Sequence, residues 1–165
     1  MNQKSDFAGF PERVRAGAKR PDAYYERLPG RYAVHKGGEE QDVAGAEMTF
    51  EEEGIAVFKG EPGESAVPKA PLTPVYKLHP DGPVAVPTGQ IFLRFKEDVD
   101  ASTRREEIER AGYEIVQIPP YAPSSAWVRS ASGDLAKSLA DIDALEKLAD
   151  VENVEPQMLV ERALR

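Results

Sequence analysis

The stretch "QIFLRFKE", residues 90–97, decides the fold prediction because its apolar side chains alternate with other side chains at strand period. One face of the predicted strand carries Ile91, Leu93 and Phe95, and the other carries Phe92, Arg94 and Lys96. Successive side chains of a strand point to opposite faces of its sheet. If the aliphatic face is buried, Phe92 and Arg94 must point outward.

The residues that follow alternate between helix and strand signals. The segment "DASTRREEIERAG", residues 100–112, has Asp100 as an N-cap and Gly112 where a helix should stop. The later segment "DLAKSLADIDALEKLA", residues 134–149, spaces its leucines and isoleucine as one amphipathic helix. Both segments are therefore predicted to be helices with one buried side.

Three more strands are expected around these helices. They are "YEIVQI" at 113–118, "SAWVRS" at 125–130 and residues 151–154. The order β-α-β-β-α-β is the ferredoxin-like arrangement, in which two helices cover one face of a four-stranded antiparallel sheet. The sequence therefore predicts an α+β fold, with a ferredoxin-like domain at residues 89–165.

The face of this sheet without helices is expected to carry large side chains in water. Pleat alternation places there Phe92, Arg94, Glu114, Val116, Ile118, Trp127 and Arg129. A large exposed apolar patch usually marks an interaction surface. The alternative is that residues 32–88 fold back and cover this face.

The upstream half reads as an irregular extension that contains a β-hairpin. Residues 1–31 form a cationic arm, with seven basic against four acidic side chains, that is expected to be mobile when free. Residues 32–88 form a small β-rich region in which 48–50 and 55–58 pair around an acidic turn. A proline-rich linker at 61–74 and a turn at Asp81 and Gly82 follow, so residue 88 is a predicted boundary.

Composition argues against several classes of function. The net charge of −8 disfavours nucleic acid as a partner, since phosphate binding needs a cationic surface. There is no Cys, and His35 and His79 are the only histidines, so no metal site and no cofactor is expected. No motif for a nucleophile or a phosphate loop was found, which predicts a protein that is not an enzyme and has no small-molecule ligand.

The polar start and the lack of a long apolar run predict a soluble, cytoplasmic protein with no membrane contact.

The same segments also resemble a known family. Strand "IFLRFKEDV", helix "REEIERAG", strands "YEIVQIPPY" and "SAWVRS", helix "DLAKSLADIDALEKLADV" and the strand "VENVEP" resemble, in order and spacing, the N-terminal propeptide domain of subtilisin-type serine proteases. The resemblance covers roughly residues 88–165 and departs at Trp127, where an aliphatic residue or Tyr is more usual. It leaves the long N-terminal extension unexplained.

The resemblance implies a subtilisin-like serine protease as partner, in a complex of one to one. The open sheet face would pack on the protease, and Glu114 would satisfy a helix N-terminus there. The segment at 157–165 would enter the active-site cleft as a substrate-like strand. The residues implied in the cleft are Leu159, Val160, Glu161, Arg162, Ala163, Leu164 and Arg165. Because the chain opens with a polar segment, the interpretation favours a separately encoded inhibitor, similar to bacterial inhibitors of the PopD type, that also assists folding of its protease.

Two other interpretations stay open at this stage. Ferredoxin-like sheets also bind RNA through aromatic side chains on the open face, and Phe92 with Trp127 fit that role. The open sheet could also pair with a second copy of the chain in an assembly without a protease.

Overall fold

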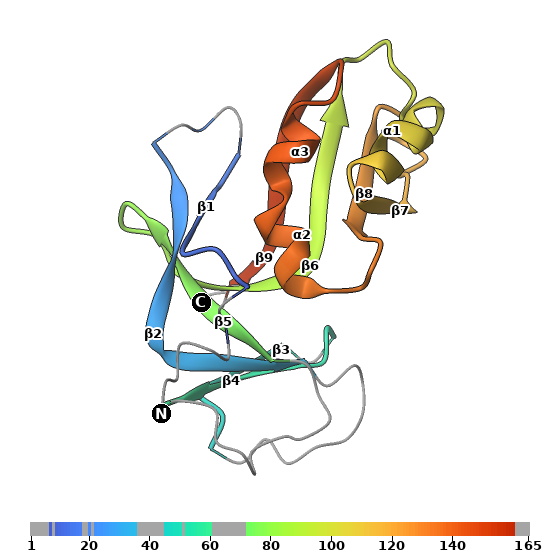
Figure 1. Cartoon of the computed structure of the whole chain (residues 1–165). Helices are drawn as coiled ribbons and strands as arrows, with labels where there is room; N and C mark the ends of the chain where they lie inside the picture. Colours follow the sequence, from blue (N-terminus) through green and yellow to red (C-terminus); the bar gives the residue numbers. More distant parts are fainter. Residues whose placement is uncertain are drawn as a thin grey trace.

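The computed structural model describes residues 7, 9–17, 20, 22–35, 45–50, 52–60 and 72–160. The fold is α+β, with mainly antiparallel strands and a few short helices (Figure 1). The upstream strands are β1 (Arg13–Arg15), β2 (Tyr24–His35), β3 (Met48–Phe50), β4 (Ile55–Lys59) and β5 (Leu72–His79). The downstream elements are β6 (Val84–Phe95), η2 (Ala101–Arg104), α1 (Arg105–Arg110), β7 (Tyr113–Gln117), β8 (Ser125–Ser130), α2 (Leu135–Ala140), α3 (Ile142–Glu146) and β9 (Val151–Val160).

The described strands form one nine-stranded sheet, in which β6 joins the two halves of the chain. The main path is β3-β4-β2-β5-β6-β8-β7, while β1 pairs with β2 and β9 pairs with β6. The start of β6 pairs with β5, and residues 90–94 pair with β8. The boundary predicted at residue 88 therefore falls inside a continuous strand.

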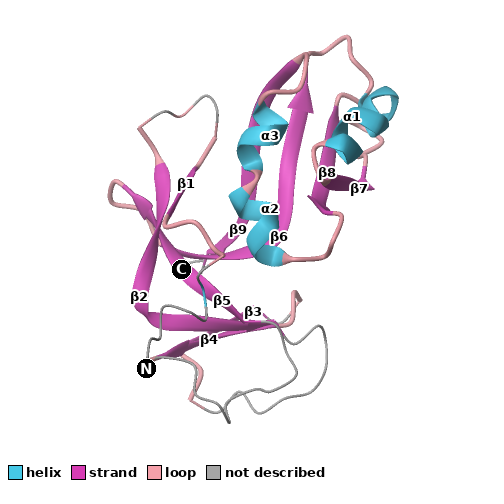
Figure 2. Cartoon of the chain, viewed as in Figure 1, coloured by secondary structure: helices cyan, strands magenta, loops and turns pink. Residues whose placement is uncertain are grey.

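In the downstream half, four neighbouring strands lie in the order β9-β6-β8-β7, all antiparallel. The helices α1, α2 and α3 lie on the same face of these strands (Figure 2). Ile91, Leu93 and Phe95 are buried beneath them, as the alternation in residues 90–97 predicts. The hairpin predicted around residues 48–58 is also present as β3 and β4.

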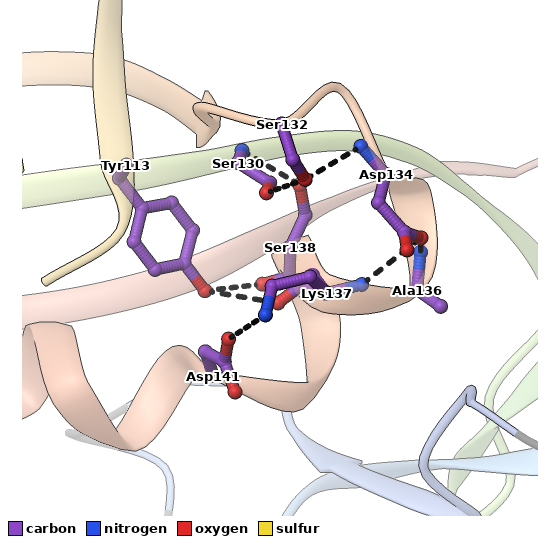
Figure 3. Close-up of polar contacts among 8 residues, drawn as sticks. All are labelled: Tyr113, Ser130, Ser132, Asp134, Ala136, Lys137, Ser138 and Asp141. Atoms are coloured by element: carbon purple, nitrogen blue, oxygen red, sulfur yellow. Dashed lines mark hydrogen bonds and ion pairs between the residues drawn. The ribbon is translucent and has the colours of Figure 1, made fainter.

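The predicted helix ends are confirmed, with one difference. The Asp100 carboxylate accepts a hydrogen bond from the Ser102 N–H at 2.9 Å, and Gly112 has a φ of 94° at the helix stop. Asp134 accepts from the Ala136 N–H at 2.9 Å and so caps α2 (Figure 3). The single helix expected from 134 to 149 is instead two short helices, α2 and α3, which meet at Asp141.

Tyr113 ties β7 to the helical layer. Its buried hydroxyl donates to the Ser138 carbonyl at 2.6 Å, and the Ser138 hydroxyl accepts from the Ser130 N–H at 2.9 Å (Figure 3). Burial raises the pKa of Tyr113, so the hydroxyl stays protonated and keeps donating. These bonds satisfy polar groups that would otherwise be costly to bury.

Two core clusters run through the molecule. The first core cluster contains the residues beneath the helices, namely Ile91, Leu93, Phe95, Ile108, Tyr113, Ala126, Val128, Leu139, Ile142, Leu145 and Val154. It extends into the upstream half through Phe7, Phe10, Val14, Tyr32, Val34 and Tyr76. The second core cluster lies between the upstream strands and comprises Ala33, Ile55, Val57, Val75 and Val86.

The described residues of the N-terminal arm are packed into the fold, whereas its composition predicts a mobile segment. Phe7, Phe10 and Val14 are buried in the first core cluster, and the Tyr76 hydroxyl donates to the Pro11 carbonyl at 2.7 Å. These apolar residues are separated by charged residues and glycines, so the sequence shows no periodicity that would predict their burial. The described part of the arm is a packed part of the fold.

Gly89 marks the bend in β6, and we expect Gly89→Ala to lower the free energy of unfolding by about 2–4 kcal/mol. Its φ is +92°, and a Cβ there would lie 2.2 Å from Leu135 Cδ2. The matched control is Gly30→Ala, because Gly30 has a φ of +85° but no atom within 4 Å of its would-be Cβ. Urea unfolding of both variants separates backbone strain from the clash. Equal losses would show that Leu135 does not constrain the bend.

Candidate functional site

The face of β6, β8 and β7 that carries no helix holds an aromatic pair and a charged pair. Phe92 lies opposite Trp127, with ring centroids 5.0 Å apart and planes tilted by 59°. Glu114 lies opposite Arg129, and its Oε2 accepts from Arg129 Nε at 2.6 Å. Phe92 and Trp127 are each partly exposed. The sequence predicted that these four side chains share a face, and their register agrees with that prediction.

Arg94 extends this face toward β9. It lies opposite Ser125 and Asn153, both of which are buried. Among the described residues, Arg94 Nε is one of two buried side-chain nitrogens without a hydrogen-bond partner, and it lies 3.7 Å from Glu152 Oε1. Arg94 Nε is thus shielded from solvent, while the side chain as a whole stays 40% exposed.

A β-bulge in β7 changes the prediction for this face. Ile115 pairs with Val128, but the next pairing joins Gln117 to Trp127, so Val116 is the extra residue. Val116 is 40% exposed at the bulge. Ile118 was predicted on the open face and this is wrong, because the bulge reverses the alternation and Ile118 packs against the first core cluster. Gln117 instead lies opposite Trp127. Strict alternation of side chains along the strand did not predict this position.

The described charges on this face nearly cancel. Arg129 pairs with Glu114 and Arg94 with Glu152, and the Asn153 side chain donates to Glu155 at 2.6 Å. A surface that binds a polyanion would instead need unpaired cations along a groove. The face, defined from here as the Trp127 face, consists of Phe92, Arg94, Glu114, Gln117, Trp127 and Arg129. Its chemistry suits an apolar contact with a polar rim.

The last strand is longer than the sequence predicts. Instead of ending near residue 154, β9 continues to Val160, with Leu159 opposite Val86 and Val160 opposite Ala85. Pro156 is compatible with this strand because β9 pairs only with β6 among the described strands, and proline is found on edge strands, where one side of the backbone has no strand partner. Leu159 and Val160, predicted in a free tail, are therefore strand residues here.

The other residues predicted to enter a cleft lie outside the described part of the chain. They are Glu161, Arg162, Ala163, Leu164 and Arg165. The greater part of the predicted linker, residues 61–71, also lies outside it, whereas Leu72 already belongs to β5.

Among the described residues, no group of three or more histidine, aspartate or glutamate side chains could hold a metal ion. Along the same part of the chain, no helix combines the length and the apolar character needed to cross a membrane.

His35, at the end of β2, gives the fold a testable dependence on pH. Its Nε2 lies 3.0 Å from the buried Thr73 hydroxyl, and burial lowers the pKa of His35 to about 4. The unfolded chain takes up a proton below about pH 6.5 while the folded chain does not, so stability falls as the pH drops from about 6.5 to about 4. The expected loss from this group is up to about 2–3 kcal/mol.

Urea unfolding at pH 7 and pH 4 of the unchanged protein and of His35→Gln checks this expectation. The variant should lose less stability between the two values than the unchanged protein. An identical loss in both proteins would exclude His35 as a source of the pH dependence.

Comparison with protein-family models, with curated proteins and with solved structures found no match to this chain.

Proposed function

We propose that this protein is a propeptide-like inhibitor of a subtilisin-like serine protease. The observation that carries the proposal is the partly exposed Phe92–Trp127 pair on a sheet face without helices, in the same sheet whose strand β9 leads directly into residues 161–165. One surface would bind the protease, and the segment that leaves β9 would block its active site.

The proposal includes a ferredoxin-like assignment for residues 89–160. The strand order β9-β6-β8-β7, with α1 after β6 and the pair α2 and α3 after β8, supports it. This is also the order in which the motifs resembling a subtilisin propeptide follow one another. The upstream strands are then an addition to that domain that shares strand β6 with it.

Binding through the Trp127 face would draw on burial of its two aromatic rings. Complete burial of a large apolar side chain contributes about 1.5–3 kcal/mol, and Phe92 and Trp127 stand at the centre of the face. Glu114, Arg129 and Arg94 surround them, where charged groups set orientation more than affinity. Glu114 can accept hydrogen bonds from backbone N–H groups of the protease if Arg129 turns away.

Blocking of the cleft would fall to residues 161–165. An extended strand rises about 3.3 Å per residue, so five residues reach about 16 Å. This length covers several subsites of a cleft that binds substrate as an added strand, with backbone hydrogen bonds for affinity and alternate side chains for specificity. The protein itself carries out no chemistry in this proposal.

The proposal places the protein in the cytoplasm, where it would keep its protease silent and assist its folding. It assigns no cofactor, no small-molecule ligand, and neither nucleic acid nor membrane as partner.

Isothermal titration calorimetry tests the partner directly. The full chain is titrated into a subtilisin-like protease whose catalytic serine is replaced by alanine, and in parallel into single-stranded RNA. Saturable binding of one inhibitor per protease, with no heat from RNA, is the expected result. Binding of RNA without binding of the protease would overturn the proposal in favour of a ferredoxin-like RNA-binding module.

A further inference from the structure

We propose that the upstream β unit clamps the base of the inhibitory tail, so that residues 158–160 stay in the sheet and only the residues from 161 onward enter the protease cleft. The upstream β unit is defined as β1 to β5 together with residues 84–87 of β6. This inference rests on the proposed function and gives the first half of the chain a role in it.

The pairing of β9 provides the first argument. Residues 151–156 of β9 pair with residues 91–95 of β6, beneath the helices, whereas residues 158–160 pair with residues 85–87. Ala85 also pairs with Tyr76 of β5. The end of β9 is therefore built into the same layer as the upstream strands, beyond the helical half of the molecule.

Side-chain packing provides the second argument. Leu159 packs against the second core cluster, which otherwise consists of residues from β2, β4, β5 and the start of β6. Val57 and Val86, both members of that cluster, are fully buried. Met158 packs instead against the first core cluster. Lifting residues 158–160 out of the sheet would expose apolar surface on both cores at once.

Two contacts hold β9 just before residue 158. Thr88 Oγ1 donates to the Gln157 side-chain oxygen at 2.7 Å, at the bend of β6. The backbone at Gly17, between β1 and β2, lies against Glu155, since a Cβ on Gly17 would be 3.1 Å from Glu155 Cγ. The part of β9 just before the clamped segment is thus held by a residue of the first half of the chain and by a residue at the bend of β6.

Holding residues 158–160 in the sheet should lower the entropic penalty of inhibition. Ordering each residue of a mobile tail carries an entropic penalty, so a tail that is already ordered through Val160 loses less entropy when it binds. The clamp also sets the register, because the first residue free to enter a subsite is residue 161. Val57 and Val86 act here as positioning residues through Leu159.

Hydrogen exchange of the free protein tests the clamp without a protease. We expect the amides of residues 158–160 that face β6 to exchange at least ~100-fold more slowly than in an unstructured peptide, as strand amides of stable proteins do. Val57→Ala should raise the exchange rate of these amides at least ~10-fold and leave the exchange rates of residues 91–95 unchanged. The control variant Val57→Ile keeps a branched aliphatic side chain, and its amides should exchange as slowly as those of the unchanged protein. Rapid exchange at 158–160 in the unchanged protein would overturn the inference.

A reversible cross-link tests the clamp in the complex. Because the chain has no Cys, the double variant Ala85→Cys with Val160→Cys can form only one intramolecular disulfide, between two directly paired strand residues, and its monomeric form is the one tested. We expect the oxidised variant to inhibit the protease within about threefold of its reduced form, which serves as the matched control.

The outcomes separate the two proposals. If oxidation weakens inhibition more than ~100-fold and reduction restores it, β9 must detach to inhibit, which overturns the clamp and leaves the inhibitor proposal standing. If neither form nor the unchanged protein inhibits, the inhibitor proposal fails, and slow or rapid exchange at residues 158–160 still decides whether the strand is clamped.

Discussion

Removing residues 161–165 raises the inhibition constant against the subtilisin-like protease by at least ~100-fold in our account, while the shortened protein still binds. Backbone hydrogen bonds contribute about 1 kcal/mol each, so the loss of three or four costs about 3–4 kcal/mol, or about two to three powers of ten in affinity. The Trp127 face stays intact in this variant, so a weaker complex with an open active site should form. Peptide hydrolysis and calorimetry are measured side by side on the same preparation.

The control for this deletion replaces residues 161–165 by glycine and serine at the same length. This variant should inhibit more strongly than the deletion and more weakly than the unchanged protein, because it keeps the backbone hydrogen bonds but loses the side chains that enter subsites. Full inhibition by the deletion variant would show that the tail does not occupy the cleft.

Trp127→Glu is expected to weaken binding of the protease by at least ~100-fold. The change removes the larger ring of the aromatic pair and places a charge where the interface must exclude water, and an uncompensated buried charge costs about 3–5 kcal/mol. Trp127 is partly exposed in the free protein, so the fold should tolerate the change. Calorimetry gives the affinity, and urea unfolding shows that the variant is folded.

Two matched variants make the Trp127 result specific. Trp127→Phe keeps an aromatic ring beside Phe92 and should lose less than about tenfold. Tyr121→Glu places the same charge on a side chain that is 89% exposed and outside the Trp127 face, and it should bind normally. An affinity unchanged by Trp127→Glu would remove this face from the interface.

Local patterns were sufficient to predict most of the downstream half. Alternation in residues 90–97 identified the buried and outward faces of β6, and the cap Asp100 and the stop Gly112 bounded the first helical segment. These features depend on a few neighbouring residues, which a single sequence displays. Trp127 and Phe92 were placed on one face for the same reason.

Features that depend on a distant partner were missed. At Val116 the register between β7 and β8 shifts by one residue, which forms the bulge. The segment "YEIVQI" alone contains no signal for this shift. The continuation of β9 through Pro156 to Val160 depends on residues 85–87, which the sequence assigned to a different region. The burial of Phe7 and Phe10 likewise follows from long-range contacts that carry no local period.

The measurement that tests the central claim most directly is a titration of the full chain into active subtilisin-like proteases, including any encoded beside it, with peptide hydrolysis followed at several substrate concentrations. The account predicts tight inhibition that rising substrate relieves, because the tail and the substrate would compete for one cleft. Undiminished hydrolysis at every inhibitor concentration, for every protease, would contradict it.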